Sequence, residues 1–311
     1  MPAIRTENLT KDYPLGFWRP RPRRALDALS IEVGAGEIFG FLGPNGAGKT
    51  TTLKLLMQLV YPTAGRAEIL GRPAGDVTVR RRIGYLPENP YFYDYLTAEE
   101  LMTYFARLFG YPRAECAGRA ARLLDAVGIG AERRMHLRKF SKGMVQRVGI
   151  AQALINDPEV IFLDEPMSGL DPIGRREVRE LMLRLRDEGR TIFFSSHILS
   201  DAEALCSRVA ILAGGRLLAA GTLTDMLAFE IRGWEVVVAG IDAGTLRRFG
   251  PPILRVTAIA ADRCAIELAP DAEPERVVGD LRAHGAKLVS LNPMRDTLED
   301  LFLKQVAGAG R

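Results

Sequence analysis

The chain has 311 residues, 47% of them hydrophobic and 26% charged, with a formal net charge of +4. This length allows two domains with sizeable cores, and the small charge excess gives no reason to expect a nucleic-acid partner. No apolar leader opens the sequence and no run of 18 apolar residues occurs in it, so we expect a cytoplasmic protein that does not span a bilayer alone.

Three short β-rich segments come first in the chain, at residues 3–10, 25–33 and 37–43. An arginine- and proline-rich loop separates the first two, and a glycine-rich turn opens a helix after the third. Residues 82–90 then predict a strand that ends in a proline-bounded loop. Between residues 97 and 156 apolar residues recur at a three-to-four spacing, which predicts a mostly helical segment.

A nearly continuous apolar run at residues 159–166, EVIFLDEP, is typical of a buried parallel strand. An amphipathic helix follows at residues 174–189 and ends at a glycine. Residues 191–197 predict another strand, and residues 208–221 predict two more. This alternation of strands and helices implies a parallel or mixed sheet with helices packed on it.

The pattern changes near residues 224–233. Beyond them we expect strand, helix, strand, strand, helix and strand, with a further helix at residues 297–307. This β-α-β-β-α-β order predicts a small ferredoxin-like α+β domain. The sequence therefore divides into a first domain at residues 1–225 and a C-terminal accessory domain at residues 226–311.

The segment GPNGAGKT at residues 43–50 fits the phosphate-loop pattern G-x-x-x-x-G-K-[ST]. Its glycines let the backbone fold around phosphate oxygens, and the N-terminus of the following helix favours negative charge. In this pattern Lys49 reaches the β- and γ-phosphates and the Thr50 hydroxyl binds Mg²⁺. A glycine-rich turn that only caps a helix is the alternative, but a strand before it and a helix after it favour the phosphate loop.

Polar side chains end two of the predicted strands. Asp164 ends the apolar run at the carboxyl edge of the sheet, where it can hold Mg²⁺ directly or through water. Glu165 is then placed to polarise the attacking water as general base. His197 ends a second strand, at the edge where such sheets bind ligands, and can contact a γ-phosphate. The alternative is that these residues are ordinary strand ends and that the histidine is structural.

Ser141 and Gly143 open a predicted helix in the segment FSKGMVQR. Ser141 can be a simple N-cap of that helix. The functional alternative is a second helix N-terminus that binds an anion. The spacing along the chain leaves both interpretations open.

Together these motifs resemble the ATP-binding cassette of ABC transporters over about residues 3–225. GPNGAGKT looks like Walker A, and VIFLDE at residues 160–165 looks like Walker B with its catalytic glutamate. FSKGM stands where the family has its LSGGQ signature, SGLD at residues 168–171 looks like the D-loop, and His197 looks like the switch histidine. The resemblance implies an α/β P-loop NTPase with a RecA-like mixed sheet and a helical subdomain at about residues 92–156.

The resemblance also implies that two cassettes close head-to-tail, with each ATP between the Walker A of one chain and the signature of the other. Tyr13 would stack on adenine, although a core tyrosine is the alternative. The expected catalytic residues are Glu165, His197 and Lys49, and the expected Mg²⁺ ligands are Thr50, Glu88 and Asp164. The expected nucleotide contacts are Tyr13, Gly43, Pro44, Asn45, Gly46, Ala47, Gly48, Lys49, Thr50 and Thr51, with Ser141 and Gly143 reaching the γ-phosphate on the partner chain.

Two motifs depart from the family pattern. Glu88 stands where the family usually has glutamine, which keeps a metal-binding oxygen but loses the amide donor. In the signature, Lys142 replaces glycine and Met144 replaces glutamine, and the lysine would add a cation near the partner's phosphates. Such variants look like those of single-cassette exporter subunits, in which a C-terminal segment like TLEDLFL is also common.

The resemblance implies an ATP-binding and ATP-hydrolysing subunit that dimerises and drives a separate transmembrane permease, an exporter, from the inner face of the cell membrane. The resemblance implies that the surface at residues 91–110 receives the permease, whereas the alternative is that this segment belongs to the core of the helical subdomain. Tyr91, Phe92 and Tyr93 cannot all face inward on a helix, so we expect some exposure to a partner. The alternative is a soluble mechanical ATPase of the same family that acts on a ribosome or nucleic acid. Such relatives usually have two cassettes or a long coiled coil, and this sequence shows neither. The C-terminal domain could sense a ligand or stabilise the dimer.

Overall fold

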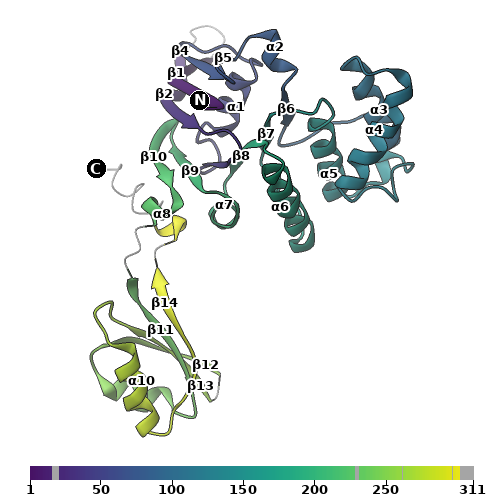
Figure 1. Cartoon of the computed structure of the whole chain (residues 1–311). Coiled ribbons are helices and arrows are strands. Elements are labelled where there is room, and N and C mark those ends of the chain that lie inside the picture. The colour runs from purple at the N-terminus through teal and green to yellow at the C-terminus, as the bar shows by residue number, and fades with distance from the viewer. Residues whose placement is uncertain (16–20, 228–230, 261, 296, 302–311) are drawn as a thin grey trace. The chain divides into compact units, whose positions relative to one another are not determined.

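The computed structural model of the chain describes residues 1–15, 21–227, 231–260, 262–295 and 297–301 (Figure 1). The chain divides into two compact units, Met1–Leu223 and Thr224–Arg311. None of the described helices is long and apolar enough to cross a membrane. The first unit contains two sheets, and the second contains one.

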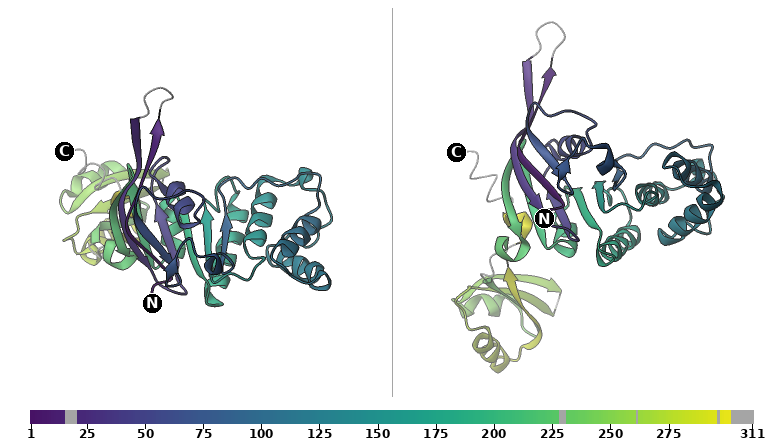
Figure 2. Two further views of the ribbon diagram at one scale, coloured as in Figure 1. Left: turned by 90° about the horizontal axis from the view of Figure 1, so that it is seen from above. Right: turned by 45° about the horizontal axis from the view of Figure 1, so that its top comes forward.

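The first sheet is antiparallel and has the order β2-β1-β4-β5. Its strands are β1 (Ile4–Leu15), β2 (Arg21–Val33), β4 (Ala64–Ile69) and β5 (Arg72–Pro73). Figure 2 shows β1 and β2 as a ribbon that projects beyond the other strands. The prediction of a loop over the whole arginine–proline segment is wrong, because residues 21–24 pair with β1. Since β2 is an edge strand, Pro22 is tolerated there; Phe17 and Trp18 lie outside the described residues.

The second sheet has the order β10-β9-β3-β8-β7-β6. Its strands are β3 (Ile38–Leu42), β6 (Ile83–Leu86), β7 (Val160–Asp164), β8 (Thr191–Ser196), β9 (Arg208–Ala213) and β10 (Arg216–Thr222). All neighbours are parallel except β9 and β10. This confirms the predicted mixed sheet and brings the carboxyl ends of β3, β7 and β8 to one edge.

Helices pack on both faces of this second sheet. Helix α1 (Lys49–Leu56) contacts β2, β4 and β7 and therefore lies between the two sheets. The fully buried Phe41, Phe162 and Phe193 belong to the core around it. Helices α6 (Pro172–Asp187) and α7 (Leu199–Leu205) pack on β3 and β8. The core thus fixes the strand ends from which the site is built.

The predicted helical segment contains α3 (Ala98–Leu108), α4 (Arg113–Ala126), a 3₁₀ turn (Leu137–Lys139) and α5 (Lys142–Ala153). Thr97 and Glu100 form a reciprocal capping box at the start of α3. Helix α5 packs against β6 and against both α3 and α4. Residues 91–93 are not helical, so the helix assumed for them was wrong, since the capping box starts the helix only after Thr97.

The short elements α2 (Val77–Arg80), α7, β4 and β5 had no prediction. A four-residue helix or a two-residue strand has too few positions to show a period. Helix α8 (Leu223–Met226) follows β10.

The second unit has one antiparallel sheet of order β12-β13-β11-β14. Its elements are β11 (Ile231–Ala239), α9 (Ala243–Leu246), a 3₁₀ turn (Arg247–Phe249), β12 (Ile253–Ala260), β13 (Arg263–Leu268), α10 (Pro274–Ala283) and β14 (Lys287–Arg295). This is the β-α-β-β-α-β order that the sequence predicted. Of the last predicted helix, residues 298–301 are helical and the rest lies outside the described residues.

Candidate functional site

The loop between β3 and α1 has the backbone that its glycines predict. Gly43, Gly46 and Gly48 have φ angles of 155°, 79° and 107°. A Cβ atom on Gly43 would lie 2.3 Å from the Leu212 carbonyl oxygen, and one on Gly48 would lie 2.6 Å from the Ala25 carbonyl oxygen. Only glycine fits these two positions, because both the dihedral angle and the space exclude a side chain. No side chain caps α1, so its first N–H groups are available to an anion.

Lys49, the first residue of α1, is almost fully buried. Its Nζ donates to the carbonyl oxygens of Gly43 at 2.7 Å and Pro44 at 3.3 Å. The same Nζ lies 3.2 Å from Oε1 of Glu165, which is also buried. Oε1 accepts no hydrogen bond of good geometry in the described part of the chain, so this contact is an ion pair alone. The two predicted residues therefore meet at the base of the glycine loop.

The carboxyl ends of β7 and β8 are held together by one serine. Ser195 Oγ donates to Asp164 Oδ1 at 2.6 Å and accepts from the Glu165 N–H at 3.0 Å. Glu165 has a φ of 51°, which is uncommon for a residue with a side chain. His197 Nδ1 lies 2.8 Å from Glu165 Oε2. The Glu165 carboxylate thus faces both Lys49 and His197.

Asp164 offers an oxygen that can serve a metal ion. Its Oδ2 is buried and has no hydrogen-bond partner within the described ranges. Burial raises the pKa of Asp164, against the opposing effect of hydrogen bonds from Ser195 and Thr50. A hard cation would compensate this buried charge, and carboxylate and hydroxyl oxygens are the donors that Mg²⁺ prefers. Asp164 and Thr50 therefore fit Mg²⁺.

Protein side chains supply only a few of the ligands that Mg²⁺ would need at this site. The described residues contain no group of three His, Cys, Asp or Glu side chains that could hold a metal ion. Glu88 is exposed and lines the pocket at the glycine loop. One or two carboxylates with substrate phosphates are the usual way in which Mg²⁺ is bound, so the donor set is one that a nucleotide would complete.

A cavity of about 660 Å³ opens over the loop. The predicted residues that line it are Tyr13, Asn45, Gly46, Ala47, Gly48, Lys49, Thr50, Thr51, Glu88, Glu165 and His197. Gly43 and Pro44 do not line the cavity but hold Lys49 through their carbonyl groups. Its size is that of a small-molecule site, and Arg23, Arg24 and Lys49 in its lining favour an anionic ligand.

Six lining residues had no assigned contact from the sequence: Arg23, Arg24, Ala25, Ser168, Gly214 and Gly215. The two arginines belong to the basic cluster at residues 19–24, and Gly214 and Gly215 form the turn between β9 and β10. Basic and glycine character could have indicated the arginines and the glycines, and Ser168 stands in the SGLD segment that the sequence analysis singled out. Ala25 carries no local signal, since pairing across the fold brings it to the pocket.

Ser141 and Gly143 lie elsewhere in the first unit. Ser141 caps α5 by accepting from the Met144 N–H at 3.2 Å. Both residues line a second cavity of about 390 Å³ together with Lys142 and the segment around Asp171, which caps α6. The structure therefore does not bring them to Lys49 within one chain.

Comparison with known proteins gives consistent matches. A family model described as ABC transporter matches residues 26–168. The chain is 45% identical over 310 residues to an ABC transporter ATP-binding protein of Synechocystis sp., covering 99% of this chain and 86% of that protein. It is 39% identical over 226 residues to the fluoroquinolones export ATP-binding protein of Mycobacterium tuberculosis, covering 72% of each. The solved dimer of the ATP-binding cassette MJ0796, in a post-hydrolysis state bound to ADP and Pi, is 26% identical, with a TM-score of 0.65 over 71% of this chain and 98% of that one.

Proposed function

Because the chain belongs to the ATP-binding proteins of ABC transporters, we propose that two copies close around two ATP molecules and drive a separate transmembrane permease in export. The chain binds and hydrolyses ATP, as its family does. The observation that carries the proposal is the convergence of Lys49, Glu165 and His197 beneath the glycine loop.

In the proposed reaction Lys49 exchanges the Glu165 carboxylate for the β- and γ-phosphates. Glu165 then accepts a proton from the water whose oxygen attacks the γ-phosphorus. The bond to the bridging oxygen breaks, ADP leaves, and phosphate carries the new oxygen. His197, whose side chain is 40% exposed and 2.8 Å from Glu165, contacts the γ-phosphate. The low exposure of Glu165 excludes bulk water from its carboxylate.

The proposed magnesium ligands are Asp164, Thr50 and Glu88. The unpartnered Oδ2 of Asp164 supports the first, and the place of Thr50 in the pocket lining, in the first turn of α1, supports the second. When bound, Mg²⁺ would neutralise charge on the β- and γ-phosphates. The place of Glu88 in the pocket lining supports the third.

Dimerisation is proposed because one chain does not complete the site. Ser141 and Gly143 line a cavity apart from Lys49, so they can meet ATP only on a second copy. The similarity to a cassette solved as a dimer supports this arrangement. Lys142 lines the same cavity and would add positive charge beside the partner's phosphates.

An exposed aromatic surface supports a permease partner. Tyr91 is 94% exposed, and Tyr93, Tyr95 and Tyr104 are also exposed. A groove of about 390 Å³, lined by Leu59, Tyr85 and Phe109 among others, lies between the second sheet and the helical segment. Aromatic side chains with apolar grooves are typical of protein interfaces. We propose that a permease docks here, which would hold the subunit at the inner face of the membrane.

The proposed function is tested by trapping the complex. A tagged Glu165→Gln variant, loaded with Mg-ATP in its native cell, is purified in mild detergent and its partners are identified. We expect a polytopic membrane protein, because the trapped dimer keeps its permease. Recovery of a ribosome or DNA complex without any membrane protein would instead move the chain to the mechanical ATPases and leave the ATP site intact.

A further inference from the structure

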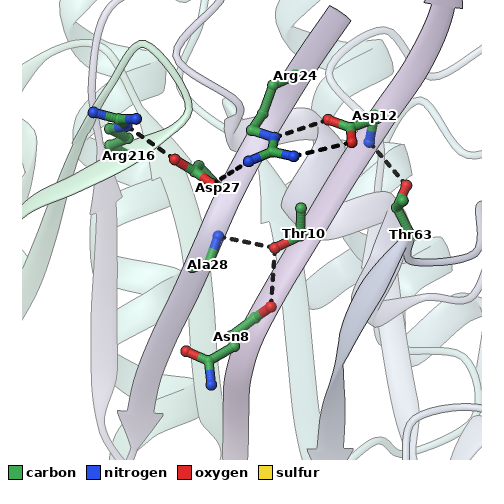
Figure 3. Close-up of polar contacts among 8 residues, drawn as sticks. All are labelled: Asn8, Thr10, Asp12, Arg24, Asp27, Ala28, Thr63 and Arg216. Atoms are coloured by element: carbon green, nitrogen blue, oxygen red, sulfur yellow. Dashed lines mark hydrogen bonds and ion pairs between the residues drawn. The ribbon is translucent and has the colours of Figure 1, made fainter. Parts of the chain in front are cut away.

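Asp27 in β2 is the centre of an ion-pair chain beside the nucleotide pocket (Figure 3). Its Oδ1 accepts from Arg24 Nη1 at 2.8 Å, and its Oδ2 accepts from Arg216 Nε at 3.0 Å. Its backbone N–H donates to the carbonyl oxygen of Gly215 at 2.8 Å. Asp27 does not line the pocket, whereas Arg24 and Gly215 do. One carboxylate thus joins two walls of the pocket, β2 and the β9–β10 turn.

Arg24 continues the chain to β1. Its Nε and Nη2 donate to the two carboxylate oxygens of Asp12 at 2.9 and 3.2 Å. This two-pronged contact fixes the guanidinium plane, and it lowers the pKa of Asp12. Asp12 is itself tied to the neighbouring segment, because its N–H donates to Thr63 Oγ1 at 2.9 Å. The arginine is therefore held between carboxylates on two strands (Figure 3).

The β1–β2 ladder is irregular where this chain crosses it. Between the pairs Thr6–Ile31 and Leu9–Leu29 the extra residue is on β1, and the next two shifts place extra residues on β2. These are β-bulges, which bend a strand and re-aim its side chains.

Two residues beside these shifts, Asn8 and Ala28, have φ angles of 47°. Thr10 Oγ1 satisfies both segments, since it accepts from the Ala28 N–H and donates to the Asn8 carbonyl, each at 3.0 Å. The Thr10 side chain thus supplies hydrogen bonds where the ladder is interrupted, and regular pairing resumes beyond the shifts, from Asp12–Arg24 to Leu15–Arg21.

That ribbon carries Tyr13, which lies directly opposite Arg23. Residues directly opposite each other in an antiparallel pair place their side chains on one face, and both of these residues line the pocket. An isolated two-stranded ribbon is only marginally stable in water. Its position over the pocket therefore depends on what ties it to the rest of the first unit.

We propose that Asp27 is a positioning residue for the nucleotide: through Arg24 and Arg216 it holds the ribbon bearing Tyr13 and Arg23 at the base-binding end of the pocket. The proposal rests on the proposed function of this pocket as the ATP site. The Asp27 carboxylate acts on the base and ribose, because its oxygens contact Arg24 and Arg216. The β9–β10 turn is joined to the phosphate loop by a backbone bond, from the Gly215 N–H to the Ala47 carbonyl oxygen at 3.0 Å, which does not involve that carboxylate. Lys49 keeps its own contacts with the glycine loop.

The test compares Asp27→Asn and Arg216→Gln in the full chain. Each substitution removes one charged group from the ion-pair chain around Asp27. Because the Arg216 side chain is 74% exposed, replacing Arg216 is compatible with folding. We expect the KM for ATP to rise about five-fold in Asp27→Asn, the scale set by loss of exposed ion pairs, with kcat within about two-fold. The inhibition constant of inorganic tripolyphosphate, which lacks base and ribose, should not change.

Two comparisons complete the test. The double variant should have the same KM for ATP as Asp27→Asn alone, because both substitutions interrupt the same chain of ion pairs. Glu7→Gln removes a carboxylate that pairs with Arg5 and Arg66 on the same sheet but does not line the pocket, and it should behave as wild type. An unchanged KM in Asp27→Asn, or an equal change for ATP and tripolyphosphate, would overturn the proposal. Failure of wild type to hydrolyse ATP would instead refute the proposed function itself.

Discussion

At the residue scale, Lys49 and Glu165 form a buried ion pair, and both have proposed roles in hydrolysis. Both side chains are less than a tenth exposed, and a buried charge needs a partner. When a triphosphate enters, it competes with Glu165 for the lysine. This exchange would free the carboxylate for its proposed role at the moment when substrate is present.

Removing the lysine side chain tests the phosphate loop. We expect Lys49→Ala to weaken Mg-ATP binding by about a hundred-fold, since one charge-assisted contact to phosphate contributes about 3 kcal/mol. Isothermal titration calorimetry measures the affinity. Lys54→Ala is the matched control, because Lys54 is exposed on the same helix. Unchanged affinity in Lys49→Ala would contradict the phosphate-loop assignment.

Asp164 gives a prediction about pH. Burial raises its pKa in the folded state, so the folded protein holds this proton more tightly than the unfolded chain. Ionisation of Asp164 therefore lowers the stability of the folded protein as the pH rises from the ordinary pKa of aspartate through the raised pKa of the folded state. Without nucleotide, Asp164→Asn should unfold at a higher temperature than wild type, with a larger gain at pH 8 than at pH 5. Thermal unfolding monitored by circular dichroism measures this gain in Tm. A Tm of Asp164→Asn below that of wild type at pH 8 would be inconsistent with a costly buried charge.

At the scale of elements, helix α5 reaches β6 through a glycine. A Cβ atom on Gly84 would lie 2.0 Å from the carbonyl oxygen of Ala153 at the end of α5. Because that atom belongs to the backbone, a rigid-body shift of the helix is needed to relieve the clash. The same helix begins at Ser141, the cap of the signature segment.

Gly84→Ala should therefore destabilise the protein by about 3 kcal/mol or more, the upper range of overpacking effects. Gly118→Ala is the control, since Gly118 lies exposed in α4 and faces only the flexible end of Arg122. There alanine should stabilise by about 0.5–1 kcal/mol through helix propensity. Urea unfolding of both variants and of wild type measures the free energy of unfolding. If Gly84→Ala were as stable as wild type, α5 would be free to move away from β6.

Local patterns predicted the long elements well. The apolar run before Asp164, the amphipathic helix after it and the order of the second unit all carry periodic or propensity signals. The length of β1 and β2 was missed, because Pro22 reads as a loop residue and only pairing with β1 makes it part of a strand. Helix α7 was missed because its seven residues are too few for a clear period.

Some residues of the candidate site could likewise be predicted from the sequence, and others could not. Lys49, Asp164, Glu165 and His197 stand at strand or helix ends that the sequence identifies, and they meet because parallel strands share one edge. Ser195, which holds two of them together, was not singled out. Its role depends on the register between β7 and β8, and register cannot be read from either strand alone.

For the whole molecule, the central claim is that one chain holds only half of a working ATP site. Lys49 and Ser141 line different cavities of the first unit. Two copies with matching contacts would satisfy both halves in a closed two-fold arrangement. ATP would then act as the link between copies, and its hydrolysis would release them.

The most direct test is the molar mass of the Glu165→Gln variant by size-exclusion chromatography with light scattering, with and without Mg-ATP. We predict that ATP doubles the mass while hydrolysis falls by orders of magnitude, because the base is lost and binding is kept. Adding Lys49→Ala to this variant should abolish the doubling. If Glu165→Gln binds ATP but keeps the mass of a single chain, or if it hydrolyses ATP at a near-normal rate, the account is contradicted.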